Sequence, residues 1–317
     1  MPIQRGRNRI VRVVTVSQDQ LERESGDLLE RTIARLNQAA SFQPDIACLP
    51  ELFSNRPPEP VPGPLSVRLS EWAREHSSYL IFGLKTRING RVSNSTVLID
   101  RKGRIIGQYN KIHPTEGELQ EGIQPGDVEP VVFETDFGTI GIQICFYVNW
   151  GDVWKRLKQK GVKIVFFPSA YPAARQLSAL ALMNQYYVVS STMRGSSRIY
   201  DISGEVVASS GHYQQWAGAA LPLGKRLFEI DYHLDKVREI QRKYGSKVEV
   251  TWFHDDSWFT LASLDPDLAT EDVISVFGLT PLDDYRARAT TAINKMRAGA
   301  QIPRARRRLS GAGPQRR

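Results

Sequence analysis

The sequence predicts a layered α/β fold, and three observations support this prediction. Short apolar runs of strand length alternate with segments in which apolar residues recur at helical spacing. Two residue pairs typical of tight turns, Asn89-Gly90 and Lys102-Gly103, separate some of these runs. A length of 317 residues with 41% hydrophobic and 24% charged content is typical of one large α/β domain with an extension.

Strands are expected in ten places along the main domain. They are Ile10–Val16, Asp45–Leu49, Tyr79–Leu84, Ser95–Asp100, Arg104–Tyr109, Val131–Glu134, Thr139–Cys145, Lys163–Pro168, Tyr186–Ser190 and Ser197–Tyr200. Because both turn pairs lie between Tyr79 and Tyr109, this region is predicted to fold as hairpins.

Helices are expected where apolar residues form a stripe along one face. Gln18–Gln38 and Pro64–His76 have such stripes in the first part of the chain. Towards the C-terminus, Tyr232–Lys243 and Pro281–Arg297 are predicted helices, and Lys247–Phe253 is a predicted short strand.

These elements divide the chain into three predicted parts. Residues 1–264 are the main domain, residues 265–299 a helical extension and residues 300–317 a basic, disordered tail. From Arg286 onward lie 10 of the 42 Lys and Arg residues and none of the 34 Asp and Glu residues, so the preceding chain has a net charge of about −2. The body therefore lacks the basic excess of a nucleic-acid-binding protein, and such contact stays open for the tail alone.

The composition also indicates a location. The sequence has neither an apolar run of about 18 residues for a membrane span nor the apolar segment of a secretory signal at its start. It has two cysteines, Cys48 and Cys145, which is too few for a disulfide scaffold. A cytoplasmic protein is expected.

Cys145 is the candidate nucleophile because of its position at the end of a strand. The run Thr139–Cys145 alternates like a strand and is followed by a helix-like stretch. A thiol near the first N–H groups of a helix is expected to have a lowered pKa, which makes it a better nucleophile. Cys48 lies within an apolar strand and is predicted to be an inert core residue.

Two further side chains with useful chemistry also follow predicted strands. Glu51 comes after Asp45–Leu49, where a carboxylate suits general acid–base chemistry. Lys111 comes after Arg104–Tyr109 and can stabilise a developing negative charge. His113 lies two residues further and would share its face in an extended chain, either as a supporting residue or as the base of a Cys–His dyad.

The order and context of these residues resemble the nitrilase superfamily of carbon–nitrogen hydrolases. That family has a glutamate in a Pro-Glu context, a lysine in a Tyr-x-Lys-x-His context and a cysteine ending a Gly-x-x-Ile-Cys strand, and this chain has CLPELF, YNKIH and GIQIC in that order. The resemblance covers roughly Arg9 to Asp231. It implies a four-layer αββα sandwich with a C-terminal extension, a catalytic trio of Glu51, Lys111 and Cys145, and no metal or organic cofactor.

The resemblance also implies residues that support the trio. A second glutamate joins the site in many members, and Glu121 is preferred here to Glu118. The backbone N–H of Phe146 is expected to help Lys111 hold the negative charge. The residues expected to bind substrate are Tyr147, Asn149, Trp150, Ala170 and Tyr171.

The implied activity is hydrolysis of a non-peptide carbon–nitrogen bond through an acyl-thioester on Cys145. The substrate is expected to be a small amide, ureido compound or nitrile. An amidase is preferred to a nitrilase, because the Cys-Trp-Glu sequence typical of nitrilases is absent. An N-acyltransferase stays open, as does a binding or scaffold protein that uses the basic tail. A homo-oligomer is also expected, since family members commonly dimerise.

Overall fold

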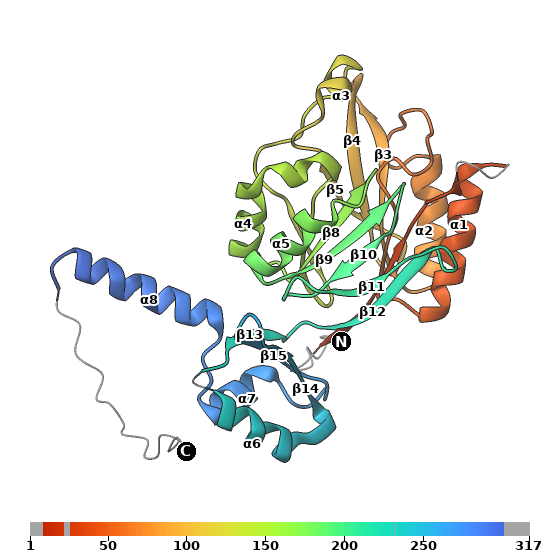
Figure 1. Cartoon of the computed structure of the whole chain (residues 1–317). Helices are drawn as coiled ribbons and strands as arrows, with labels where there is room; N and C mark the ends of the chain where they lie inside the picture. The colour runs from red at the N-terminus through yellow and green to blue at the C-terminus, as the bar shows by residue number, and fades with distance from the viewer. Residues whose placement is uncertain (1–8, 22–25, 232, 301–317) are drawn as a thin grey trace, which may run out of the picture.

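The structure is a computed structural model that describes residues 9–21, 26–231 and 233–300 (Figure 1). The predicted basic tail lies outside the described residues from Gln301 onward. The described chain contains two six-stranded sheets, a three-stranded sheet and eight α-helices.

The first sheet has the strand order β12-β1-β2-β3-β4-β5. Its strands are β1 (Ile10–Val16), β2 (Ile46–Cys48), β3 (Tyr79–Ile88), β4 (Arg91–Ile99), β5 (Ile105–Asn110) and β12 (Trp216–Pro222). Strands β1, β2 and β3 are parallel, whereas β3, β4 and β5 form antiparallel hairpins, as the turn pairs predict. Asn89 and Gly90 both have a positive φ, which the tight turn between β3 and β4 requires.

The second sheet has the order β11-β10-β9-β8-β7-β6. Its strands are β6 (Val132–Thr135), β7 (Gly138–Ile142), β8 (Ile164–Ser169), β9 (Tyr187–Thr192), β10 (Arg198–Tyr200) and β11 (Val206–Ser209). Strands β7, β8 and β9 are parallel. Both large sheets therefore have a parallel centre, which is typical of sheets covered on both faces.

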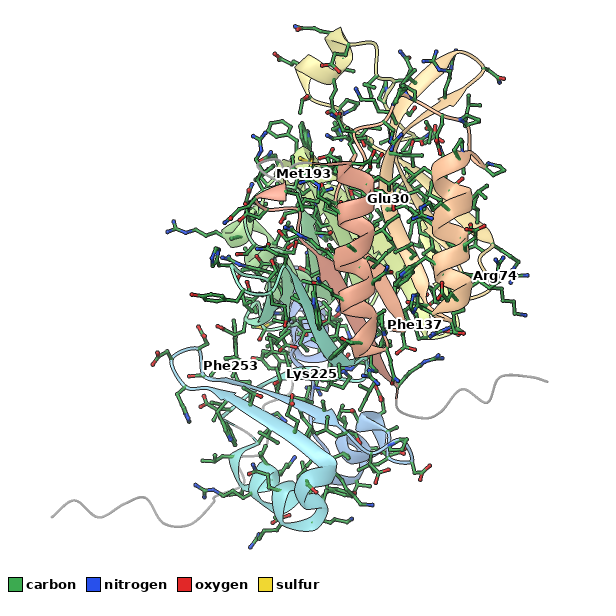
Figure 2. The ribbon with its side chains drawn as sticks, turned by 90° about the vertical axis from the view of Figure 1, so that its right-hand side faces the viewer. Glu30, Arg74, Phe137, Met193, Lys225 and Phe253 are labelled. Atoms are coloured by element: carbon green, nitrogen blue, oxygen red, sulfur yellow. The ribbon has the colours of Figure 1, made fainter. Side chains whose placement is uncertain are left out.

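The two sheets pack face to face and helices cover their outer faces. Val13 and Ile81 of the first sheet and Ile142 and Phe167 of the second belong to one buried apolar cluster. Helices α1 (Leu28–Ala39) and α2 (Pro64–Glu75) cover the first sheet, as Figure 2 shows, and α4 (Gly151–Gln159) and α5 (Ala174–Asn184) cover the second. The predicted four-layer αββα sandwich is confirmed.

Helix α1 begins later than its apolar stripe predicts. The expected helix Gln18–Gln38 is observed only from Leu28, because Asp27 caps it by accepting hydrogen bonds from the backbone N–H groups of Leu29 (2.8 Å) and Glu30 (3.2 Å). The described residues before the cap are not α-helical.

A smaller C-terminal unit lies beyond one end of the sandwich (Figure 1). It contains a sheet of β13 (Arg226–Glu229), β15 (Trp258–Ser263) and β14 (Val248–Phe253), with helices α6 (Leu234–Tyr244), α7 (Thr270–Phe277) and α8 (Leu282–Arg297). This unit has its own apolar cluster, which includes Phe228, Val237 and Phe259. The third sheet lies before residue 264, so the division of the chain at that residue stays a prediction.

Lys225 links the two parts of the molecule. Its buried ammonium lies 3.3 Å from Asp201 of the sandwich and 2.7 Å from Glu249 of β14. Figure 2 shows Lys225 at the junction between the sandwich and the C-terminal unit. Since a buried charge is costly unless it is paired, this ion-pair network favours one fixed arrangement at the junction.

Candidate active site

Strands from both sheets end at a common edge. Ser191, near the end of β9, donates hydrogen bonds to the backbone oxygens of Val16 (2.7 Å) and Cys48 (3.1 Å), the last residues of β1 and β2. The segments that follow these strands carry the candidate residues, as is usual for open α/β sheets.

Glu51 is held in a tight turn after β2. The turn lies so close to β3 that a Cβ on Gly83 would come within 2.8 Å of Glu51 Cα and of the Leu52 nitrogen. Leu52 has a φ of +45°, a strained value for a residue with a side chain. Glu51 is only 4% exposed, so its carboxylate lies almost entirely out of bulk solvent.

Lys111 brings two glutamates together. Its ammonium donates hydrogen bonds to Glu51 Oε1 (3.0 Å) and to Glu118 Oε2 (2.8 Å). The side-chain amide of Asn94 on β4 donates to Oε1 of both glutamates at 2.7 Å. One lysine and one asparagine therefore fix two carboxylates in a buried cluster.

A short helix fixes the second of these glutamates. Helix α3 (Glu116–Gln120) begins with a capping box, in which the Thr115 backbone N–H donates to Glu118 Oε2 at 2.7 Å and the Glu118 N–H donates to Thr115 Oγ1 at 3.2 Å. The same carboxylate thus caps a helix and faces Lys111.

The ion pairs decide the charge states around Lys111. Burial alone lowers the pKa of Lys111, but the charges of Glu51 and Glu118 outweigh it and hold that pKa above its ordinary value. Burial raises the pKa of Glu118, but hydrogen bonds from Lys111, Thr115 and Asn94 lower it overall. Lys111 is therefore a cation and Glu118 an anion at neutral pH.

Cys145 lies in a strained turn that follows β7. The strand ends at Ile142, earlier than predicted, and Cys145 has a φ of +49° at the start of a 3-10 helix, Cys145–Asn149. Such a φ is costly for a residue with a side chain and occurs often at functional sites. Cys145 is 7% exposed.

The expectation of a lowered pKa for Cys145 is wrong. Burial raises that pKa to about 12, with a further contribution from the negative charge of Glu51, and Lys111 only partly opposes this. The 3-10 helix has five residues, so its weak dipole does not offset the desolvation of a thiolate. The thiol is protonated in the free protein and needs a base to attack.

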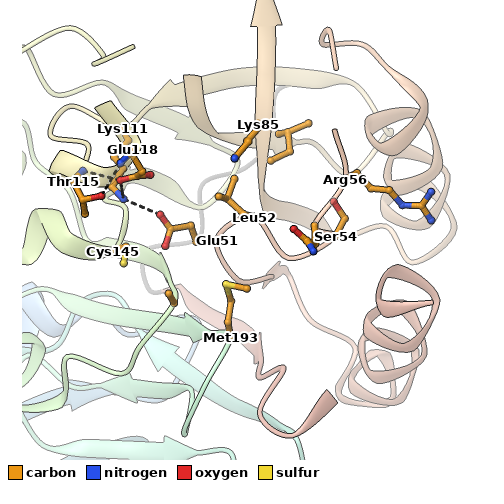
Figure 3. Close-up of a pocket in the computed structure, with 13 residues that line it drawn as sticks. Glu51, Leu52, Ser54, Arg56, Lys85, Lys111, Thr115, Glu118, Cys145 and Met193 are labelled. Atoms are coloured by element: carbon orange, nitrogen blue, oxygen red, sulfur yellow. Dashed lines mark hydrogen bonds and ion pairs between the residues drawn. The ribbon is translucent and has the colours of Figure 1, made fainter. Parts of the chain in front are cut away.

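The trio opens into one cavity of about 330 Å³. Figure 3 shows the Glu51 carboxylate between Lys111 and Cys145, with Lys85, Leu52 and Met193 among the other lining residues. The lining residues are Glu51, Leu52, Ser54, Asn55, Arg56, Leu84, Lys85, Lys111, Thr115, Glu118, Cys145, Ala170 and Met193. A nucleophile, a carboxylate and a cation thus face one space of small-molecule size.

Comparison with known protein families shows to which family the chain belongs. The sequence model of the family described as carbon-nitrogen hydrolase matches residues 11–224. The chain belongs to this family. The matched residues begin in β1 and end just before β13, so they span the sandwich of this carbon–nitrogen hydrolase.

Individual relatives agree with the assignment. The carbon–nitrogen hydrolase is 27% identical over 255 residues to the omega-amidase NIT2 of Homo sapiens, covering 69% of this chain and 91% of that protein. It is 29% identical over 230 residues to the omega-amidase NIT2 of Xenopus tropicalis, covering 62% and 83%. The sequence-based prediction of a carbon–nitrogen hydrolase is confirmed, and these relatives favour an amidase among its alternatives.

Solved structures confirm the fold. Saccharomyces cerevisiae Nit3, a member of the nitrilase superfamily, has a TM-score of 0.60 at 19% identity, covering 74% of this chain and 94% of that one. An amidase from Nesterenkonia sp. has a TM-score of 0.57 at 17% identity, covering 74% and 96%. Together with the family model and the relatives, this shared fold confirms the predicted resemblance to the nitrilase superfamily.

The two candidates for the second glutamate differ in position. Glu118 contacts Lys111, whereas the preferred residue, Glu121, has a side chain that is 66% exposed and lies 3.4 Å from the ammonium of Lys85. The preference for Glu121 is corrected on this geometry. Glu118 is in the first turn of α3, where its carboxylate turns back to the Thr115 N–H and Lys111, whereas Glu121 is the C-cap residue at the other end of the helix.

His113 belongs to an aromatic stack of the carbon–nitrogen hydrolase. Its ring centroid lies 4.8 Å from that of Tyr147 and 4.4 Å from that of Trp150, with nearly parallel planes. His113 does not line the cavity, whereas Glu51 does, which favours Glu51 as the base over a Cys–His dyad. Two residues expected to bind substrate, Tyr147 and Trp150, thus form this stack beside the cysteine turn.

The other predicted residues occupy varied positions. Ala170 lines the cavity, and burial together with the charges of Cys145 and Glu51 raises the pKa of Tyr171. Phe146 is 41% exposed. The side-chain amide of Asn149 donates to the backbone oxygen of Phe146 at 2.9 Å, on the exposed side of the turn.

Sequence reasoning missed two residues of the site. Asn94, Ser95 and Thr96 match a glycosylation sequon, and nothing in that match indicates that Asn94 donates to both glutamates. Its position on β4, which adjoins the strand preceding Lys111, is the signal that points to it. Lys85 on β3 lines the cavity, but nothing in the pattern around it separates it from a surface lysine.

The described part of the chain has neither a candidate metal site nor a membrane-spanning helix. Residues 9–21, 26–231 and 233–300 contain no group of three or more His, Cys, Asp or Glu side chains that could hold a metal ion. In the same ranges, each helix is too short or too polar to cross a bilayer.

Proposed function

We propose that this carbon–nitrogen hydrolase is an amidase that cleaves a small amide through an acyl-thioester on Cys145. The observation that supports this most is the convergence of Cys145, Glu51 and Lys111 on one cavity, with Lys111 bonded to Glu51 at 3.0 Å. The names of the relatives, omega-amidases, agree with it.

The first half of the reaction forms the acyl-enzyme. Glu51 removes the proton of the Cys145 thiol, whose pKa of about 12 keeps it protonated until then, and the sulfur attacks the amide carbon. The oxyanion that develops is stabilised by the Lys111 ammonium and the backbone N–H of Phe146. The protonated Glu51 gives its proton to the departing nitrogen as the carbon–nitrogen bond breaks, which leaves the thioester.

The second half releases the acid. Glu51, again a carboxylate, removes a proton from water as the water oxygen attacks the thioester carbon. Lys111 stabilises the second oxyanion in the same way, and the proton returns from Glu51 to the sulfur as the carbon–sulfur bond breaks. Glu118 and Asn94 act as positioning residues that hold Lys111 and Glu51 in place throughout.

A positive charge in the cavity lining indicates the class of amide. Lys85 lines the cavity, and among the described residues its ammonium forms an ion pair with the exposed Glu121 alone, at 3.4 Å. An exposed pair of this kind contributes little, so a substrate carboxylate can replace Glu121 at small cost. The proposed substrate is an amide with a carboxylate at its other end.

The experiment that tests this function is a substrate panel with ammonia detection. Amides, ureido acids and nitriles are each incubated with the wild-type protein, with Cys145→Ala and with Glu51→Gln. We expect ammonia from amides and loss of at least about 100-fold of the rate in both variants. Turnover of nitriles alone, or transfer of the acyl group to added amines instead of water, would reject the amidase.

A cytoplasmic location is part of this proposal. Both cysteines, Cys48 and Cys145, are free and buried. A nucleophilic thiol that must remain reduced suits a reducing compartment.

A further inference from the structure

A buried hydrogen bond joins the segments that carry Lys111 and Cys145. The hydroxyl of Tyr109 donates to the side-chain oxygen of Gln143 at 3.1 Å. Tyr109 lies in β5, two residues before Lys111. Gln143 follows β7 and lies two residues before Cys145. The bond therefore crosses from the first sheet to the second close to both the cation and the nucleophile.

Burial makes this bond important for both partners. Tyr109 is 2% exposed and Gln143 0%, so bulk water does not replace the bond when it is lost. A buried polar group without a partner is costly. Among the described residues, the bond to Tyr109 is the only hydrogen bond of the Gln143 side chain, whose amide nitrogen has no partner there. The orientation of the Gln143 side chain therefore depends on Tyr109.

The Tyr109 hydroxyl also contacts the backbone that follows Lys111. Burial and the nearby Tyr147 raise the pKa of Tyr109, and a hydrogen bond from the backbone N–H of Ile112 opposes them in part. Ile112 is the residue directly after Lys111. One hydroxyl therefore holds both the turn that carries the cation and the side chain of Gln143.

The face of β5 that carries Tyr109 packs against the second sheet. Gly107 is two residues before Tyr109 in the same strand and so lies on the same face. A Cβ on Gly107 would collide with the ring of Phe133, on β6. Because β5 and β6 approach so closely at this glycine, the Tyr109 hydroxyl is held beside the second sheet.

The segment from the end of β7 to Cys145 depends on such an anchor. Strand β7 pairs with β8 up to Ile142, and the Gln143 backbone N–H donates to the Phe166 oxygen at 2.9 Å. The chain then enters the strained turn at Cys145, whose φ is +49°. Because a strained turn persists only where its surroundings determine it, the bound side chain of Gln143 helps to fix the position of the thiol.

We infer that Tyr109 and Gln143 are a pair of positioning residues, whose bond sets the distance between the Lys111 ammonium and the Cys145 thiol. This inference rests on the proposed function, in which both groups act on one substrate carbon. Neither Tyr109 nor Gln143 is among the residues that line the cavity, so the pair acts through Lys111 and Cys145 and does not touch the substrate. A displacement of the reacting groups by about 1 Å slows the chemical step and leaves substrate binding almost unchanged.

Tyr109→Phe tests the pair, because it removes the hydroxyl and keeps the ring. With a neutral amide we expect kcat to fall at least about tenfold and KM to stay within about twofold of wild type. Tyr187→Phe is the matched control. The buried hydroxyl of Tyr187 also joins the two sheets, since it donates to the Pro222 backbone oxygen at 2.9 Å, but Pro222 lies beside Ile10, at the end of β1 that is remote from the site.

The kcat of Tyr187→Phe is expected to stay within about twofold of wild type, although both variants lose a buried hydrogen bond. An unchanged kcat in Tyr109→Phe, or an equal loss in Tyr187→Phe, would overturn the inference.

A double variant separates positioning from stability. Gln143→Leu keeps a side chain of similar size, so Tyr109→Phe combined with Gln143→Leu removes both partners and leaves neither of them unpaired. We expect the urea midpoint of the double variant to be at or above that of Tyr109→Phe, and its kcat to stay within about threefold of that of Tyr109→Phe. Recovery of kcat together with stability, or a loss equal to the product of the two single losses, would reject a positioning pair.

The same assay separates this inference from the proposed function. Ammonia release by the wild-type protein, with Cys145→Ala as the blank, tests the proposed function. An inactive wild-type protein would reject both, whereas an active wild-type protein with an unchanged Tyr109→Phe variant would reject the positioning pair alone.

Discussion

At the level of single residues, the site depends on one lysine between two carboxylates. Lys111 is almost fully buried and donates to Glu51 and to Glu118. A buried cation with two anionic partners keeps its charge, and it is held where an oxyanion would develop. Removing the negative charge of Glu51 or Glu118 would lower the pKa of Lys111 and would remove a hydrogen bond that holds its ammonium in place.

Glu118 and Glu121 are therefore expected to respond differently to substitution. Glu118→Gln removes the negative charge that faces Lys111, so we expect kcat to fall by about 100-fold or more. Glu121→Gln is the matched control, because Glu121 is exposed and pairs with Lys85 instead of Lys111, and its kcat is expected to stay within about twofold of wild type. Steady-state kinetics on a neutral amide checks both, and a larger loss in Glu121→Gln would contradict the assignment.

Lys85 is expected to determine binding of charged substrates. Lys85→Gln should raise KM for a carboxylate-bearing amide by about tenfold and leave the kinetics of a neutral amide unchanged. Glu121→Gln should lower KM for the charged amide, since it frees the Lys85 ammonium. Equal effects of Lys85→Gln on both amides would show that Lys85 has a structural role instead.

The raised pKa of Cys145 gives a pH prediction. The thiol is neutral when protonated, and its pKa is about 12, so its thiolate fraction increases with pH and does not saturate at moderate pH. The rate at which iodoacetamide alkylates Cys145 should therefore keep increasing from about pH 8 to about pH 10. Peptide mapping separates Cys145 from Cys48, and a plateau below about pH 9 would instead mean a lowered pKa.

At the level of elements, the turn after β2 depends on a glycine in the neighbouring strand. Gly83→Ala would place a Cβ 2.8 Å from Glu51 Cα, so we expect the free energy of unfolding to fall by about 1–3 kcal/mol and kcat to fall with it. Gly151→Ala is the matched control, because a Cβ there meets nothing within 4 Å. Urea denaturation and kinetics check both, and an unchanged Gly83→Ala protein would contradict the close packing of turn and strand.

Elements were predictable from the sequence where local pattern decides their structure. Strand β1 has the predicted bounds Ile10–Val16, and helix α2 lies within the predicted Pro64–His76. Strand β12 was not predicted, because its stabilisation comes from antiparallel pairing with β1 about 200 residues away in the chain. The predicted start of α1 is wrong because the apolar stripe extends to residues before the Asp27 cap, where the helix begins.

The same distinction applies to the candidate site. Glu51, Lys111 and Cys145 could be found from motifs at strand ends, but the choice between Glu118 and Glu121 depends on which end of α3 lies beside Lys111. The prediction of a lowered pKa for Cys145 is wrong because burial raises that pKa by more than the dipole of a short helix lowers it. No local sequence pattern indicates this burial. The role of Asn94 could be identified only from the structure, in which β4 lies beside the strand that precedes Lys111.

At the level of the whole molecule, two sheets with parallel centres bring the ends of their strands to one edge. The nucleophile comes from the second sheet, after β7, whereas Glu51 and Lys111 come from the first, after β2 and β5. The site therefore exists only when both halves of the sandwich are packed together. The C-terminal unit joins the sandwich at Lys225 and does not cover the edge at which the strands end (Figure 1).

The most direct test of the central claim is mass spectrometry of the acyl-enzyme. The wild-type protein and Cys145→Ala are mixed with a small amide, quenched in acid after one turnover and digested. The account predicts that the wild-type peptide containing Cys145 gains the mass of the acyl group, that the Cys48 peptide does not, and that Cys145→Ala neither gains mass nor releases ammonia. Ammonia release by Cys145→Ala at the wild-type rate, or an adduct on a different residue, would contradict it.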